Sequence, residues 1–127
     1  MKMILFFCGL YSLAFAIFHM GFWKLFGWKK DLTKLQFYNR GIMQILNCRL
    51  IYIFLLLAFL YLYFGEALMA NAPGRVLTGG ISIFWLGRTI EQFVFLRVNN
   101  RVIHLLTVIF FLGALLFAWP LLIWVRQ

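Results

Sequence analysis

The chain has 127 residues, of which 65% are hydrophobic and 20% aromatic, whereas only 12% are charged. A soluble domain of this length has too little interior to bury so many apolar side chains, because small folds leave a large share of their surface in water. The lipid bilayer is therefore the expected environment. This composition excludes a soluble enzyme, a disulfide-built secreted domain and a separate catalytic module.

Four apolar stretches follow one another along the chain. Each is long enough to cross the hydrocarbon core once, since a helix rises about 1.5 Å per residue and the core is about 30 Å thick. The predicted spans cover about residues 3–26, 41–64, 76–97 and 102–125. Residues 1–127 are thus expected to form a single transmembrane domain, an all-α, up-and-down four-helix bundle joined by short connections.

The three connections differ in character. The first, Gly27 to Arg40, is polar but also carries aromatic and leucine side chains, so we expect it to lie partly on the membrane surface. The second, Gly65 to Arg75, contains Ala72-Pro73-Gly74, a turn signal that cannot continue a helix. The third, Arg97 to Arg101, contains two asparagines and predicts a tight reversal.

The formal net charge of +9 is best explained by membrane orientation and not by nucleic-acid binding. Most basic residues flank the first and third connections, and few lie on the opposite side. On the richer side are Lys24, Lys29, Lys30, Lys34, Arg40, Arg97 and Arg101; on the other are Lys2, Arg75 and Arg126. By the positive-inside rule the richer side is cytoplasmic, so both termini are expected outside, in a multi-pass protein of a bacterial inner membrane.

Charged residues occur inside the third predicted span. Arg88 and Glu91 lie there, with Gln92 beside them. Ionisable side chains at helix centres cost roughly 2.5 to 3.5 kcal/mol each on insertion scales, so they normally face a partner or a wet cavity. Because Arg88 and Glu91 are three positions apart, they share a helix face and can pair. One interpretation is therefore a self-neutralised ion pair that orients this helix toward the bundle.

A second interpretation rests on depth. Counted from the cytoplasmic ends of the spans, polar residues from all four helices come within one to two turns of the same level, with Arg88 one turn deeper. These candidate ligand-binding residues are His19, Arg40, Gln44, Asn47, Arg88, Glu91, Gln92 and His104. Their convergence predicts a polar pocket in the cytoplasmic half that binds an amphipathic or anionic ligand, such as a lipid headgroup or a small molecule. The two histidines are equally compatible with the headgroup boundary.

Other functions use the same residues. His19 and His104 are able to ligate a haem iron from two sides if their helices are neighbours, and a metal site that adds Glu91 is chemically possible although no ligand spacing supports it. A chain with almost no extramembrane mass also suits an accessory subunit of a larger membrane complex, or a homo-oligomer. The sequence leaves open whether the protein is an enzyme and whether it takes a cofactor, with haem and glutathione as the two candidates.

The segment from Arg40 to Asn47, followed by Cys48, resembles the membrane-associated proteins of eicosanoid and glutathione metabolism in the spacing of its arginine and asparagine. Those proteins are similarly short four-span chains that assemble as trimers and bind glutathione between subunits. The resemblance implies that Arg40 and Asn47 contact the charged groups of a thiol cofactor, helped by Arg88 and Arg101. The chain departs from the family at Asn39 and Leu50, where acidic residues are expected.

Overall fold

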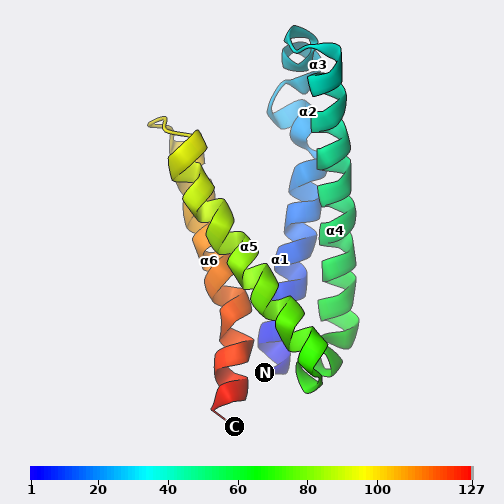
Figure 1. Cartoon of the computed structure of the whole chain (residues 1–127), viewed down its shortest axis with the longest axis vertical. Coiled ribbons are helices and arrows are strands. Elements are labelled where there is room, and N and C mark those ends of the chain that lie inside the picture. The colour runs from blue at the N-terminus through cyan, green and yellow to red at the C-terminus, as the bar shows by residue number, and fades with distance from the viewer. Residues whose placement is uncertain (127) are drawn as a thin grey trace.

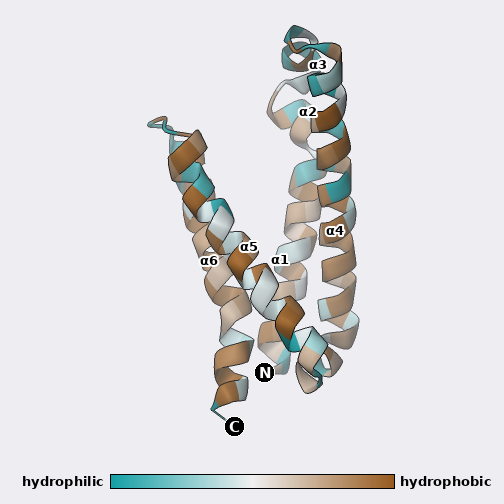
Figure 2. Cartoon of the chain, in the orientation of Figure 1, coloured by the Kyte–Doolittle hydropathy of each residue, from teal (hydrophilic) through white to brown (hydrophobic). Residues whose placement is uncertain are grey.

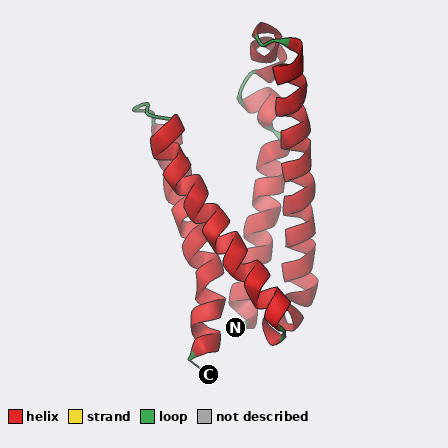
Figure 3. Ribbon diagram, in the orientation of Figure 1, coloured by secondary structure: helices red, strands yellow, loops and turns green. Residues whose placement is uncertain are grey.

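The computed structural model describes residues 1–126, and within them the protein is all-α, with no strand (Figure 3). Loops and turns are confined to the helix ends. The helices are α1 (Lys2–Met20), α2 (Phe22–Leu25), α3 (Trp28–Asp31), the 3-10 helix η1 (Leu32–Lys34), α4 (Phe37–Ala70), α5 (Ala72–Phe95) and α6 (Arg101–Val125).

The four long helices form two antiparallel hairpins, α1 with α4 and α5 with α6 (Figure 1). Packing within each hairpin is far more extensive than packing between them. The hairpins lie close together at the end that holds both termini, and they diverge toward the end that holds α3. The two termini are therefore on the same side of the molecule, and the gap between the hairpins widens away from them.

Three helices, α1, α4 and α6, are long and apolar enough to cross a membrane. The fourth long helix, α5, has 24 residues but includes Arg75, Arg88 and Glu91, and it does not meet the same criterion of length and composition. Figure 2 shows apolar residues along most of the long helices and hydrophilic residues concentrated at α3 and around the turn between α5 and α6.

The first predicted span, 3–26, is not one continuous helix, because α1 ends at Met20 and the short α2 (Phe22–Leu25) follows Gly21. The chain bends at Gly21 and forms a small cap, residues 21–36, which contains α2, α3 and η1. Gly27 has a φ of 60°, in the left-handed region that favours glycine, and this residue redirects the chain between α2 and α3. The indole N–H of Trp23 donates to Gln44 Oε1 at 3.2 Å and fastens the cap to α4.

The second predicted connection was also wrong in extent, because only Asn71 separates α4 from α5. Its side-chain oxygen accepts a hydrogen bond from the Gly74 N–H at 2.8 Å, and its amide donates to the Ala67 carbonyl at 2.6 Å. Pro73 lies in the first turn of α5, where a missing N–H costs no helical hydrogen bond. The Ala72-Pro73-Gly74 signal thus marks a helix start, and no loop forms here.

The remaining helix limits differ from the predicted spans by a few residues. Helix α4 extends the predicted 41–64 segment at both ends, and α5 occupies 72–95 instead of 76–97. Helix α6 starts one residue before the predicted 102–125 segment, where the Asn100 side chain accepts from the Val102 N–H at 2.8 Å. The tight reversal expected near the third connection is residues 96–100.

An aromatic layer around Trp85 joins the two hairpins. Trp85, on α5, is 2% exposed and its ring contacts aromatic rings from α1, α4 and α6. The ring centroids lie 4.5 Å from Phe15, 5.5 Å from Phe54 and 5.6 Å from Phe110. Such ring pairs contribute beyond the area they bury, so this layer stabilises the contact between the hairpins.

Closer to the termini, polar side chains add specific links. The Tyr61 hydroxyl, on α4, donates to Thr78 Oγ1 on α5 at 2.8 Å. The Tyr11 hydroxyl, on α1, donates to the Ile109 carbonyl of α6 at 2.8 Å. Hydrogen bonds between helices are valuable in an apolar environment because the alternative is an unsatisfied polar group.

The turn at Asn71 should depend on Gly74. A Cβ at this position would lie 2.0 Å from the carbonyl oxygen of Leu68, so Gly74→Ala forces backbone to move. We expect this variant to lose about 1 to 3 kcal/mol of unfolding free energy, measured by detergent denaturation. Gly80→Ala is the matched control, since a Cβ there meets nothing within 4 Å and should be neutral or slightly stabilising. Equal stability of both variants would contradict the role of Gly74.

Candidate functional site

A cleft of about 710 Å³ lies between the diverging hairpins. Its walls are mainly aromatic and aliphatic, and its volume falls in the range of small-molecule sites. The apolar lining comprises Phe18, Phe22, Phe26, Leu50, Phe54, Phe84, Trp85, Leu96, Val102, Ile103, Leu106 and Phe110, and the polar lining comprises His19, Arg88, Glu91 and Gln92. All four long helices contribute to this lining.

The ion pair predicted on the third span is present on α5. Arg88 Nη1 lies 2.5 Å from Glu91 Oε2, one turn along the helix. The two side chains are 36% and 48% exposed, so the pair is open to the cleft and is not sealed in the core. The guanidinium of Arg88 also lies over the Phe110 ring, 5.0 Å from its centroid, a cation–π contact with α6.

His19 lines the cleft, and one of its ring nitrogens is engaged by its own helix. Its Nδ1 lies 2.9 Å from the Phe15 carbonyl oxygen, and because a carbonyl only accepts, Nδ1 carries the proton. In the neutral ring, Nε2 is then a hydrogen-bond acceptor. The imidazole stacks on Phe22 with centroids 4.4 Å apart, which fixes its orientation in the cleft wall.

Gln92 has a different position from its charged neighbours. It is 3% exposed, and its amide donates to the Ile103 carbonyl of α6 at 3.4 Å. This hydrogen bond joins α5 to α6 at the open end of the cleft. Gln92 therefore stabilises the packing of α5 against α6, and few of its polar atoms are available to a ligand.

The candidate residues of the second predicted span, Arg40, Gln44 and Asn47, do not line the cleft. Gln44 accepts from Trp23 and donates to the Arg40 carbonyl, so it holds the cap. Arg40 lies over the Phe37 ring at 5.8 Å and lines a separate hollow under the cap. Asn47 is buried and its amide donates to the His19 carbonyl at 3.0 Å, at the end of α1. Arg40 and Asn47, the residues that carry the family resemblance, thus face different surroundings.

His104 also lies apart from the cleft. It is exposed, and its Nε2 lies 3.0 Å from Asn99 Oδ1 in the turn before α6. It lines a small groove beside that turn, whereas His19 lines the cleft. The two histidines therefore do not face one cavity, and this arrangement offers no shared position for a haem iron between them. Within residues 1–126, no three His, Cys, Asp or Glu side chains come together as a metal site.

The aromatic walls of the cleft and Arg49 were not among the functional residues predicted from the sequence. The periodicity of Trp85, Arg88 and Gln92 places them on one face of α5, and Phe15, His19 and Phe22 share a face of α1 and the turn after it. That spacing could have identified the wall residues. Arg49 lies on the exposed face of α4, with its guanidinium 5.9 Å from the Tyr52 ring centroid, and no predicted role accounted for this charge.

The cleft has the chemistry of an amphipathic site. One end offers a guanidinium, a carboxylate and an imidazole nitrogen, and the rest offers aromatic and aliphatic surface. A ligand with a polar head and an apolar body would match both parts. Comparisons with protein-family models, with curated proteins and with solved structures find no match.

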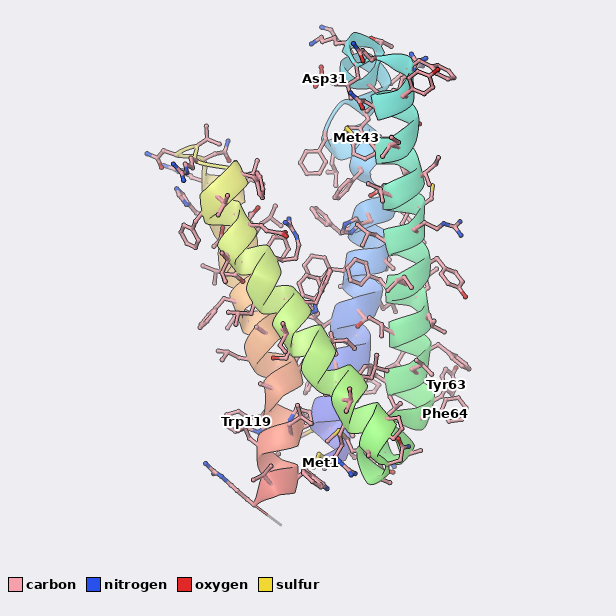
Figure 4. All side chains as sticks on the ribbon, viewed as in Figure 1. Met1, Asp31, Met43, Tyr63, Phe64 and Trp119 are labelled. Atoms are coloured by element: carbon pink, nitrogen blue, oxygen red, sulfur yellow. The ribbon has the colours of Figure 1, made fainter. Side chains whose placement is uncertain are left out.

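Trp85 should be the most sensitive side chain of the cleft wall. Trp85→Ala removes the contacts with rings from three other helices, and we expect a loss of about 3 to 5 kcal/mol in unfolding free energy. Trp119, near the terminal end of α6 in Figure 4, is 55% exposed and serves as the control. Detergent denaturation followed by circular dichroism measures both variants. A cost for Trp119→Ala as large as that for Trp85→Ala would show that the layer has no special role.

Proposed function

We propose that this protein crosses the membrane four times, with both termini outside, and binds an amphipathic ligand in the cleft between its hairpins. The polar head of the ligand lies against Arg88 and Glu91, and its apolar body lies between the aromatic walls. The observation that carries this proposal is the Arg88–Glu91 pair, which is exposed in a cleft that is otherwise almost entirely apolar.

The helix lengths support this orientation in a bilayer. At about 1.5 Å per residue, Lys2 to His19 spans about 25 Å and Arg75 to Arg88 about 20 Å. With Lys2, Arg75 and Arg126 at the outer boundary, a hydrocarbon core about 30 Å thick ends near Arg49 and just beyond Glu91. Arg88 and His19 are then about a turn or two inside the inner boundary, below the usual level of the lipid headgroups.

The same placement of the helices in the bilayer accounts for the length of α4. Its 34 residues extend about 51 Å, so about 20 Å project beyond the hydrocarbon core on the inner side. The cap lies on this projection and contains Lys24, Lys29, Lys30 and Lys34. Basic residues on this side agree with the positive-inside rule and favour the cytoplasm of a bacterial inner membrane as the location of the cap.

An ion pair open to a cleft requires a polar partner at this depth. Charged groups in the hydrocarbon region cost several kcal/mol unless they are paired and hydrogen-bonded. The pair partly compensates Arg88 and Glu91, yet both retain exposed polar atoms. Water or the head of an amphipathic molecule would satisfy these atoms, and the apolar walls around them favour a molecule that brings its own apolar body.

The ligand proposal is tested by removing the guanidinium. Purified protein in nanodiscs that contain equal amounts of phosphatidylethanolamine and phosphatidylglycerol is released into the gas phase, and native mass spectrometry counts the retained lipids. We expect Arg88→Gln to reduce retention at least tenfold, since charge-assisted hydrogen bonds contribute about 1.5 to 3 kcal/mol.

Arg97→Gln is the control for loss of one positive charge outside the cleft. Arg97 lies in the turn after α5, and its Nε donates to the Phe93 carbonyl at 3.1 Å. This variant should retain lipid as the wild type does. Unchanged retention by Arg88→Gln would overturn the proposal, and the pair would then serve only to orient α5.

The topology is tested by thiol accessibility. In a background with Cys8→Ala and Cys48→Ala, a single cysteine is introduced by Thr33→Cys in the cap or by Ala72→Cys beside the Asn71 turn. A membrane-impermeant maleimide should label the Ala72→Cys protein in intact cells and the Thr33→Cys protein only in inverted vesicles. The opposite pattern would place both termini in the cytoplasm, and equal labelling of both would exclude four spans.

A further inference from the structure

We propose that the cleft selects a zwitterionic phospholipid whose head carries both a phosphate and a primary ammonium group. This inference rests on the proposed function and names the class of ligand. It follows from the pairing of a cation with an anion at the polar end of the cleft, where both side chains keep free polar atoms.

Arg88 provides the phosphate contact. A guanidinium has five N–H donors, and Glu91 engages Nη1. The other donor nitrogens, Nε and Nη2, form no hydrogen bond within the described residues, and the side chain is 36% exposed. The planar arrangement of these donors matches two oxygens of one phosphate, a geometry that arginine provides and lysine does not.

Glu91 and His19 provide the ammonium contact. Glu91 Oε2 faces Arg88, which leaves Oε1 as an acceptor on a side chain that is 48% exposed. His19 lines the same cleft, and because Nδ1 is engaged by the Phe15 carbonyl, Nε2 is the nitrogen left as a second acceptor. The surrounding rings of the wall present negative faces, which also attract a cation.

The charge balance separates this class from anionic lipids. Arg88 and Glu91 together are formally neutral, so a lipid with only a phosphate gains from Arg88 and is repelled by Glu91. A head that also carries an ammonium gains from both. The acceptors further favour a primary amine over a trimethylammonium, because a site built around hydrogen bonds rejects an analogue that lacks the donor.

The apolar walls distinguish a lipid from its free headgroup. Most of the cleft lining carries no polar side chain, and Phe54, Phe84 and Phe110 lie deeper than the ion pair, beside Trp85. A soluble headgroup would leave this surface uncovered. Acyl chains would cover it, and they reach the cleft from the inner leaflet.

The experiment compares retention of three lipids by the full-length protein. Nanodiscs contain equal amounts of phosphatidylethanolamine, phosphatidylglycerol and phosphatidylcholine with identical acyl chains, and native mass spectrometry identifies the lipids that remain bound. We expect the wild type to retain phosphatidylethanolamine at least tenfold over each of the other two. This comparison requires no variant and therefore does not depend on any variant folding.

Glu91→Gln tests the origin of the selectivity. The variant leaves Arg88 without its anion, so we expect the preference to change from phosphatidylethanolamine to phosphatidylglycerol. Glu66→Gln is the matched control, because Glu66 is exposed near the outer end of α4, and it should keep the wild-type preference. Melting temperatures of all variants verify that the fold is kept.

Each alternative outcome has a distinct meaning. Preferential retention of phosphatidylglycerol by the wild type, lost in Arg88→Gln, would overturn the zwitterion inference and keep the proposed function. Retention that does not change in Arg88→Gln would overturn both. Displacement of bound lipid by water-soluble glycerophosphoethanolamine at equal concentration would identify the free headgroup as ligand and would overturn the lipid inference.

Discussion

The packing of Trp85 between the two hairpins is the interaction on which the rest of the structure depends. Its ring on α5 contacts Phe15 of α1, Phe54 of α4 and Phe110 of α6. Between this layer and the termini, the one-residue link at Asn71 holds α4 and α5 together. Beyond the layer no covalent connection joins the hairpins, and they diverge. The cleft therefore results from where the contact between the hairpins ends.

This position of the contact determines the environment of the charged residues. Arg88 lies one turn beyond Trp85 on α5, at the point where the hairpins separate, so its guanidinium reaches Glu91 and the Phe110 face but is not enclosed. Deeper in the core the same two charges would lose contact with solvent and would find no other polar groups to replace it. For a buried ion pair, the free energy of desolvation often exceeds the attraction between the charges. At this level the pair remains accessible from the cleft.

The cap has a separate structural task. Gln44 and Asn47, on the part of α4 that extends past the end of α1, bind Trp23 and the His19 carbonyl respectively. These contacts stabilise the reversal after α1 and hold His19 at the cleft wall. The polar residues that were predicted to lie at one depth in the membrane thus divide into two groups. One group stabilises the cap and the end of α1, and the other faces the cleft.

The sequence by itself determined the helical class, the apolar character of the long helices and the Arg88–Glu91 pair, because these depend on composition and on spacing along a single helix. It misplaced the end of α1 and the length of the second connection. The helix ends at Met20 and at the Asn71 turn depend on local backbone conformation, which hydropathy does not indicate. Only the tertiary structure decided which polar residues meet. His19 joins Arg88 and Glu91, whereas Arg40 and His104 face elsewhere, because the rotation of each helix about its axis is set by packing against its neighbours.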